Sequence, residues 1–362
     1  MPTAAMTGPT DVKPTVLIVD DEAAPRAALT QILRNNFQVL TAENARAAMA
    51  VLNDHGVDLV TLDLRLPDRS GAELLTEIKR AHAEIEVIMV TAYGTLQSAM
   101  DCIRQGAAGF LLKPFNATEL LTISLQTTQK KQRLDMLREW LASDKDLWGP
   151  EPACTEAWHK LAAAYGSRFK QGILQNTDAG EPSPLLQLLS DLLEAKDRHL
   201  VNHGNRVSFY ASLVANRMQL SLPEQNILSL GALAHDLDLI HIPAKPVLQQ
   251  ETDRSSHRTD LGARIGRALG LPADAVQIIA LHHERWDGTG YPFGLQGQRI
   301  PLPARITTLA QAFDHLTAER SGTTPLTVKA ALDEIERQAG TAFDPALTEI
   351  FCRAMREQPP QA

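Results

Sequence analysis

Two patterns of apolar positions divide the chain into two regions. In the first region, short runs rich in valine, leucine and isoleucine recur at residues 16–19, 57–62, 87–90 and 109–112. Segments with helical character, such as 71–80, separate these runs. Strands that alternate with helices predict a doubly wound parallel α/β fold with helices on both faces of the sheet. From Leu185 onward the apolar positions recur at helical spacing, which predicts an all-α domain.

A helical connection is predicted between the two regions. Apolar residues recur at helical spacing over 117–141, although Thr127 and Lys130 interrupt the stripe. The pattern fits either an extended last helix of the first domain or a dimerising helix. Glycine and proline residues then punctuate 144–184. We therefore expect a first domain over 14–130, a helical linker over 131–182 and a second domain over 183–357.

Composition and charge limit the class of protein. The 362 residues carry a formal net charge of −8, without any run of lysine and arginine residues. Because no basic helix-turn-helix pattern follows residue 140, DNA binding is not expected. No apolar stretch approaches roughly 18 residues, so no membrane span is expected. The three cysteines lie far apart, which argues against a disulfide framework and favours a cytoplasmic protein.

Polar side chains stand at the ends of four predicted strands. Asp20 and Asp21 follow the first, Asp63 the second, Thr91 the third and Lys113 the fourth. Functional groups of such folds gather at the carboxyl ends of the strands, so these side chains should lie together. Clustered carboxylates favour Mg²⁺, and an aspartate beside that ion can accept a phosphoryl group. Each residue alone could instead cap a helix, but four such strand ends favour the phosphoryl site.

This region resembles the receiver domains of response regulators. The resemblance rests on the acidic pair and on the stretches 63–71, 91–94 and 113–115. It implies a flavodoxin-like five-stranded sheet, Asp63 as the phosphoacceptor and a sensor histidine kinase as the partner. The resemblance assigns the Mg²⁺ site to Asp20, Asp21 and Asp63. It assigns the conformational switch to Thr91, Lys113 and Phe110.

Residues 282–292 form the densest group of chemically active side chains. Two adjacent imidazoles, His282 and His283, precede two acids, a glycine-rich turn and a Tyr-Pro pair. Neutral imidazole and carboxylate are good ligands for first-row divalent metals. A histidine pair at a helix end can also be purely structural, so the metal hypothesis requires further ligands elsewhere in the chain.

Such ligands occur upstream, and with them the second region resembles the HD-GYP domains. These domains are a branch of the HD-superfamily phosphohydrolases that hydrolyse cyclic di-GMP with two or three metal ions. The resemblance covers about residues 183–357 and implies an all-α fold. The residues that match its ligand positions are Glu194, His203, His235, Asp236, His282 and His283. The residues that match its binding loop are Asp287, Gly288, Gly290, Tyr291 and Pro292. Arg305 is a positively charged residue nearby in the sequence that is grouped with this loop.

Three positions depart from the pattern of the family. Leu239 replaces a lysine that would meet the substrate phosphate, Arg258 replaces a ligand histidine, and Gln311 replaces a bridging aspartate. A neutral amide is a poor substitute for a carboxylate, and arginine cannot coordinate a cation. We therefore expect either a single Fe, Mn or other divalent ion, or an empty site in which Arg258 pairs with Asp236 or Glu194.

Two functions remain open. The favoured one is a phosphorylation-controlled response regulator that binds cyclic di-GMP or a diguanylate cyclase (GGDEF) domain without normal catalysis. The alternative is an active cyclic di-GMP phosphodiesterase with a reduced metal set, in which Arg305 meets the phosphate. In either case, phosphorylation of Asp63 is expected to shift Thr91 and Phe110. This shift is expected to alter homodimerisation or the angle of the helix over 117–141.

Overall fold

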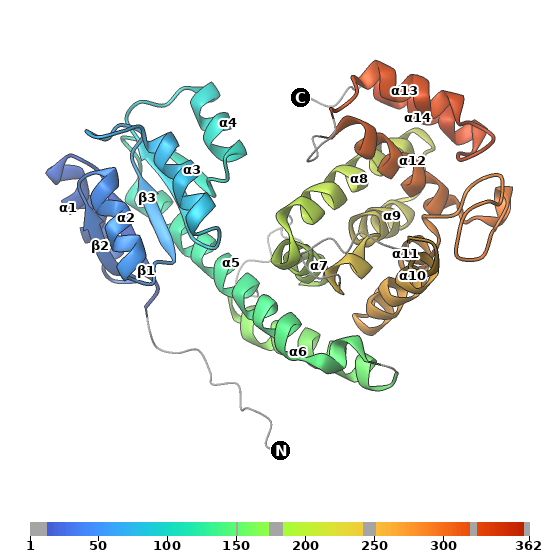
Figure 1. Ribbon diagram of the computed structural model, residues 1–362, viewed down its shortest axis with the longest axis horizontal. Helices are drawn as coiled ribbons and strands as arrows, with labels where there is room; N and C mark the ends of the chain where they lie inside the picture. The colour runs from blue at the N-terminus through green and yellow to red at the C-terminus, as the bar shows by residue number, and fades with distance from the viewer. Residues whose placement is uncertain (1–12, 150, 174–183, 242–250, 319–323, 358–362) are drawn as a thin grey trace. The chain divides into compact units, whose positions relative to one another are not determined.

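The computed structural model describes residues 13–149, 151–173, 184–241, 251–318 and 324–357. The chain forms two compact units, Met1–Arg133 and Leu134–Ala362, and the division falls within a long helix (Figure 1). Within the described ranges, none of the helices is both long and apolar enough to cross a membrane.

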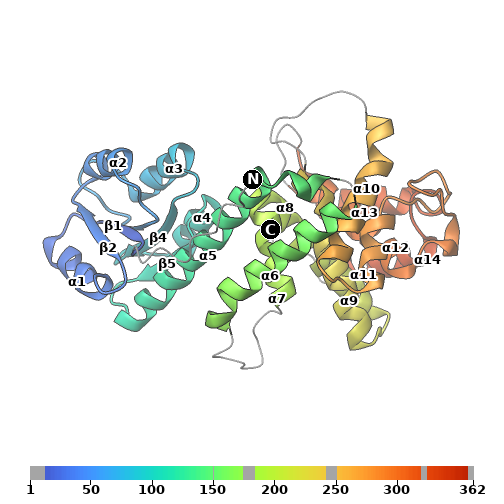
Figure 2. The same cartoon turned by 90° about the horizontal axis from the view of Figure 1, so that it is seen from below.

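The first unit contains a five-stranded parallel sheet with the strand order β2-β1-β3-β4-β5. Leu17 and Val19 of β1 pack toward α2 and α3, whereas Val16 and Ile18 pack toward α1 and α5, and Figure 2 shows these helices on opposite sides of the sheet. The predicted doubly wound fold is therefore confirmed. The strands are β1 (Thr15–Val19), β2 (Gln38–Ala42), β3 (Leu59–Leu62), β4 (Glu86–Thr91) and β5 (Gly109–Leu112). The helices are α1 (Ala23–Leu33), α2 (Ala45–Asp54), α3 (Gly71–Ala81), α4 (Leu96–Arg104) and α5 (Ala117–Ser143).

Strand β2 has no counterpart among the runs that the sequence predicted. It lies at the edge of the sheet, where Gln38 and Thr41 are exposed and only Ala42 is fully buried. An edge strand with this mixture lacks the continuous apolar run that marks the buried strands.

The second unit is helical throughout the part of the chain that the structure describes, as the sequence predicts. One apolar cluster joins α5, α6, α7, α10 and α11, and a second joins α8, α12, α13 and α14. The helices are α6 (Ala153–Ile173), α7 (Pro184–Lys196), α8 (Arg198–Arg217), α9 (Leu222–Ala234), α10 (Glu251–Ala268), α11 (Ala273–Leu281), α12 (Leu302–Thr317), α13 (Val328–Arg337) and α14 (Pro345–Glu357). Three short 3₁₀ helices are η1 (Lys145–Trp148), η2 (Leu237–His241) and η3 (Gly297–Arg299).

Several described residues of the segment expected as a linker over 131–182, between Leu134 and Tyr165, pack into the second unit. Leu137 and Trp158 are fully buried in the same cluster as the leucines of α7. The Trp158 indole donates a hydrogen bond to the Leu147 carbonyl (3.1 Å), and the Tyr165 hydroxyl donates one to a buried aspartate of α7 (2.6 Å). In the described residues, these aromatic side chains therefore complete the apolar core of the second unit.

Candidate functional site

The strand-end residues of the first unit form a compact charged cluster. The Lys113 ammonium lies 2.6 Å from Asp20 Oδ2 and 2.6 Å from Asp63 Oδ2, and both carboxylates are buried. Burial lowers the pKa of Lys113, but its hydrogen bonds to the two carboxylates outweigh this effect and raise it. The Asp21 side chain is exposed beside them. Lysine therefore neutralises two acids at the place where Mg²⁺ and a phosphoryl group are expected.

The expected switch residues lie on the two neighbouring strands. Thr91 is fully buried at the end of β4, and its hydroxyl accepts a hydrogen bond from the Tyr93 amide (3.2 Å). Phe110 is half-buried on β5, and a Cβ atom at Gly94 would lie 2.8 Å from its ring. The Arg65 guanidinium stacks on the exposed Tyr93 ring at 3.5 Å. The loop after β4 thus connects the threonine to the surface.

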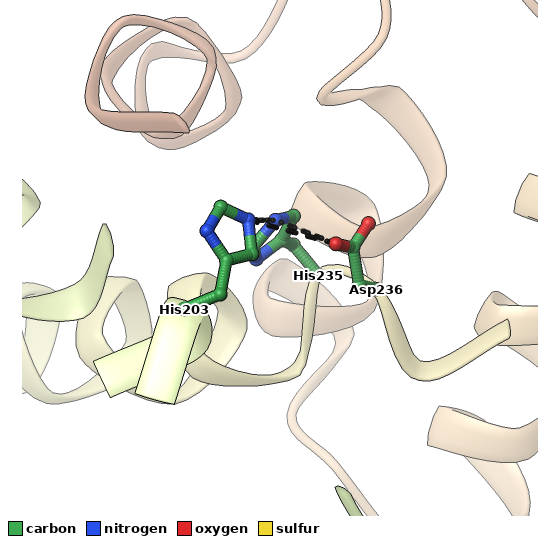
Figure 3. A group of neighbouring side chains, drawn as sticks. All are labelled: His203, His235 and Asp236. Carbon is green, nitrogen blue, oxygen red and sulfur yellow. Dashed lines mark hydrogen bonds and ion pairs between the residues drawn. The ribbon is translucent and has the colours of Figure 1, made fainter. Parts of the chain in front are cut away.

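In the second unit, histidines from three helices surround Asp236. His203 lies on α8, His235 ends α9, and His282 ends α11. Their Nε2 atoms lie 3.6, 3.4 and 3.9 Å, respectively, from the Asp236 carboxylate (Figure 3 shows the first two histidines). Potential ligand atoms lie within 4.8 Å of one another in two groups: His203 with His235 and Asp236, and Asp236 with His282 and His283.

Hydrogen bonds orient each of the three rings so that Nε2 faces the carboxylate. Each Nδ1 atom meets an acceptor, which requires the Nδ1–H tautomer in a neutral ring and leaves a lone pair on Nε2. His203 Nε2 and His235 Nε2 lie 3.2 Å apart, and the buried His282 Nε2 has no hydrogen-bond partner in the described structure, so these nitrogens could serve as ligands of a cation. The acceptors are the Asp314 carboxylate (2.6 Å from His203), the Ala232 carbonyl (2.7 Å from His235) and the Ile279 carbonyl (3.0 Å from His282).

The electrostatics of this group also suit a metal ion. Burial lowers the pKa of His235 and His282, and neighbouring imidazoles add to the shift. Burial raises the pKa of Asp236, but the surrounding imidazoles outweigh it and lower the pKa overall. Neutral imidazoles and an ionised carboxylate are the protonation states that a divalent ion requires. The residues present therefore fit a divalent metal.

Of the three departures from the family pattern, two have side chains in the described part of the structure. Gln311 is buried on α12, and Leu239 is half-buried on η2. Arg258 belongs to α10, but its side chain lies outside the described part of the structure, as does its expected ion pair. The Glu194 carboxylate lies 3.7 Å from the Arg198 guanidinium and belongs to neither ligand group of the described residues.

Glu284, directly after the histidine pair, holds the glycine-rich loop. Its buried carboxylate accepts hydrogen bonds from the backbone amides of Phe293 (2.8 Å) and Leu295 (3.0 Å). The chain passes so close at Gly290 that a Cβ atom there would lie 2.3 Å from the Arg285 nitrogen. Glycine is therefore required for this loop to close on itself.

The other loop residues form a tight turn beside the histidines. Asp287 accepts hydrogen bonds from the Thr289 amide (2.9 Å) and hydroxyl (2.6 Å), and Gly288 between them adopts a φ of +80°. The Tyr291 ring stacks on His283, with centroids 4.7 Å apart, and the Tyr-Pro peptide bond that follows is cis. The loop is therefore a defined structure that contacts one of the potential ligands.

Arg305 is engaged by the protein itself. Its guanidinium donates a hydrogen bond to the Ile300 carbonyl (2.9 Å), pairs with Asp344, and lies 5.7 Å from the centroid of the Trp286 ring. A role at a substrate phosphate would require these contacts to break. The arrangement therefore favours a structural role for Arg305 over the replacement of the missing lysine.

Comparisons with known proteins identify the domains of both units. The protein-family model of the response regulator receiver domain matches residues 16–124, and that of the HD domain matches residues 187–347. The cyclic di-GMP phosphodiesterase response regulator RpfG of Xanthomonas campestris pv. campestris is 30% identical over 93% of this chain and 87% of its own length. The chain belongs to this family of receiver–HD response regulators.

One further relative covers most of the chain, and another covers the receiver domain. A cyclic di-GMP phosphodiesterase of Thermotoga maritima is 29% identical over 95% of this chain and 91% of its own length. The chemotaxis protein CheY of Bacillus subtilis is 40% identical over 29% of this chain and 90% of its own length. The HD domain is thus related to cyclic di-GMP phosphodiesterases, and the receiver domain implies a phosphorylating kinase as a partner.

Sequence reasoning missed two residues that shape the HD site. Asp314 lies three residues after Gln311 on α12 and contacts His203, whereas Arg206 lies three residues after His203 on α8 and contacts Asp314. A spacing of three places side chains on one face of a helix, so each pair shares a face. That spacing was the available signal, but the contact between the two helices was not visible in the sequence.

Proposed function

We propose that this response regulator is phosphorylated on Asp63 by a sensor histidine kinase and that its HD domain holds one divalent metal ion. We further propose that the HD domain acts by binding a cyclic dinucleotide or a diguanylate cyclase partner and hydrolyses cyclic di-GMP slowly at most. Asp20, Asp21 and Asp63 would hold Mg²⁺ in the receiver domain, with Lys113 neutralising the phosphoryl group.

The carboxylate count of the HD site carries the proposal. Asp236 is the only carboxylate in the two ligand groups that the described residues form. One divalent ion beside one carboxylate leaves a single net positive charge, and neutral imidazoles are good ligands for such an ion. A second ion would set four positive charges against the single carboxylate of the ligand groups, because the Gln311 amide is neutral and the buried Asp314 carboxylate is already paired with Arg206. The arrangement therefore supports one ion.

The chemistry of the site supports binding over rapid turnover. A bound divalent ion would lower the pKa of a coordinated water and so supply a nucleophile. His203, His235, Asp236 and His282 would hold that ion. Leu239 offers no charge to a developing phosphate oxyanion, whereas positive groups at that position typically contribute several kcal/mol to phosphoryl and phosphodiester chemistry.

The test is metal content, nucleotide binding and hydrolysis of the purified full chain loaded with Mn²⁺ or Fe²⁺. We expect one ion per chain, measurable binding of cyclic di-GMP and slow product formation. Cyclic di-GMP should be compared with 3′3′-cGAMP, since a 3′3′-cGAMP-specific phosphodiesterase of Vibrio cholerae is 33% identical over 176 residues. Gln311→Asp should raise metal content toward two ions and increase hydrolysis at least about tenfold.

Gln277→Asp is the matched control, because Gln277 is an exposed glutamine of α11 in the same domain. It should change neither metal content nor hydrolysis. Two ions in the unaltered protein, together with hydrolysis that Gln311→Asp leaves unchanged, would contradict the proposal.

The second candidate is an active phosphodiesterase with a reduced metal set. The convergence of three Nε2 atoms on Asp236 favours it, because this arrangement leaves lone pairs free for a Lewis acid. Rapid formation of linear dinucleotide or GMP that His235→Ala and Asp236→Ala abolish would establish this candidate in place of the first.

A further inference from the structure

Asp314 contacts a proposed metal ligand from outside the two ligand groups. Its side chain is fully buried, and Oδ2 lies 2.6 Å from His203 Nδ1. The same oxygen accepts a hydrogen bond from Arg206 Nη2 (3.0 Å), and Oδ1 accepts one from Arg206 Nε. A buried carboxylate with this set of partners is fully hydrogen-bonded on the side that faces the histidine and the arginine.

The charge of Asp314 determines which nitrogen of His203 carries the proton. Both oxygens of the Asp314 carboxylate accept hydrogen bonds from the Arg206 guanidinium, and a carboxylate paired with arginine in this bidentate way is ionised. An ionised carboxylate can only accept, so His203 must donate from Nδ1. Its Nε2 lone pair then faces Asp236, 3.6 Å from Oδ2.

Two further contacts fix the plane of the His203 ring. The bidentate pairing with Arg206 holds the Asp314 carboxylate in one orientation. The His315 ring stacks on the His203 ring, with centroids 5.0 Å apart and planes at 27°. The ring is therefore held both by its edge and by its face.

We propose that Asp314 is a positioning residue for the metal site, which keeps the proton of His203 on Nδ1 and presents its Nε2 lone pair to the ion. The inference rests on the one-ion site proposed above. Groups that orient a ligand histidine in this way typically change metal affinity by about 10- to 100-fold. Asp314 would thus compensate in part for the carboxylate that Gln311 lacks.

A purely structural role is the competing explanation, and Asp191 provides a matched control for it. Asp191 is a buried aspartate of the same domain that accepts hydrogen bonds from Tyr165 (2.6 Å) and Gln187 (2.9 Å). It belongs to neither ligand group of the described residues. Asp191→Asn therefore removes a buried carboxylate charge without altering the histidines.

The experiment titrates Mn²⁺ into the metal-free full chain, its Asp314→Asn variant and its Asp191→Asn variant, with melting temperatures measured in parallel. We expect Asp314→Asn to weaken Mn²⁺ binding about 10- to 100-fold and Asp191→Asn to leave it within about twofold. Both variants should lower the melting temperature. In ¹⁵N-histidine spectra of the metal-free chains, His203 should be protonated at Nδ1 in the unaltered protein and shift toward Nε2–H in Asp314→Asn.

The outcomes separate this inference from the proposed function. Equal Mn²⁺ affinity in Asp314→Asn and the unaltered protein would overturn the positioning role and leave the metal site intact. An unaltered protein that binds no Mn²⁺ would overturn the one-ion site, and the tautomer of His203 would then decide the positioning role by itself. Protonation at Nε2 in the unaltered protein overturns that role even if a variant fails to fold.

Discussion

At the residue scale, the side chains of residues 282–292 divide between two tasks. His282 and His283 contribute potential ligand atoms near Asp236. The two acids that follow them bond instead to backbone amides of their own loop. Glu284 accepts from the amides nine and eleven residues later in the sequence, and Asp287 from the amide two residues later. Acids so engaged position the loop and leave metal binding to the histidines.

Removal of the Glu284 carboxylate should destabilise the HD domain. Glu284→Ala leaves two backbone amides without their acceptor, and we expect the free energy of unfolding to fall by about 2 kcal/mol. Asp287→Ala should lower the free energy of unfolding by clearly less than Glu284→Ala does, since the Asp287 carboxylate is partly exposed and bonds only within the turn. Urea denaturation of the two variants measures both values, and equal losses would contradict the anchoring role of Glu284.

Cys352 should make stability sensitive to alkaline pH. Burial raises the pKa of its thiol from 9.0 to about 12, and Glu336 adds to the shift. The stabilisation is fully present below pH 9 and is lost as the pH rises toward 12, because only the unfolded chain releases the proton. Between pH 8 and 10 the loss should be roughly 1 kcal/mol. Urea denaturation at the two pH values should show a smaller loss in Cys352→Ala; an identical loss would exclude this thiol as the cause.

At the scale of elements, several polar side chains of α5 are buried or form ion pairs. Thr127 and Thr128 are buried, and Lys131 forms an ion pair with Asp58 at 3.1 Å. Polar residues in this part of α5 are thus buried or paired within the first unit. Beyond Leu134 the same helix joins the core of the second unit, where Arg138 donates a hydrogen bond to the Ala195 carbonyl (3.2 Å), next to the expected ligand Glu194.

The burial of α6 in the HD core predicts a large effect for Trp158→Ala. The indole is fully buried, so its removal should lower the free energy of unfolding of the HD unit by about 3–5 kcal/mol. His159→Ala, at the exposed neighbouring position, should change it by less than about 0.5 kcal/mol. Chemical denaturation distinguishes the two cases. A separate linker over 131–182 would instead leave the stability of the HD unit unchanged by Trp158→Ala.

At the scale of the whole molecule, one continuous helix of 27 residues is shared by the receiver unit and the HD unit. The helix is covered by the sheet of the receiver unit at Leu120 and by the HD core at Leu137. We therefore expect a change in the receiver that alters α5 to reach the second unit through this helix.

Asp63→Asn should abolish the response of the whole molecule to a phosphoryl donor. With acetyl phosphate and Mg²⁺, the unaltered protein should gain one phosphoryl group and change its oligomeric state, because a phosphoryl group beside Lys113 replaces the present ion pairs. Asp54→Asn, on the exposed surface of α2, should respond like the unaltered protein. Intact mass and light scattering provide the two readouts, and an undiminished oligomeric change in Asp63→Asn would exclude this mechanism.

The sequence by itself determined the two fold classes and the residue types that gather at each site. Strand periodicity and strand-end residues are local features, and parallel strands bring their carboxyl ends together whatever the details of packing. The same holds for the histidines at the ends of α9 and α11, because a helix terminus is encoded by neighbouring residues. Edge strand β2 was missed, since its exposed Gln38 and Thr41 break the apolar run that marks the other strands.

Only the tertiary structure decided which atoms meet. His203 contacts Asp314, 111 positions away, and this contact orients a proposed ligand. Arg305 contacts Asp344, 39 positions away, and this contact engages a residue that was expected to meet the phosphate. The place of Trp158 in the HD core likewise depends on the packing of separate helices. Such pairs arise from how helices pack against one another, and hydrophobic periodicity along one helix carries no information about the partner that faces it.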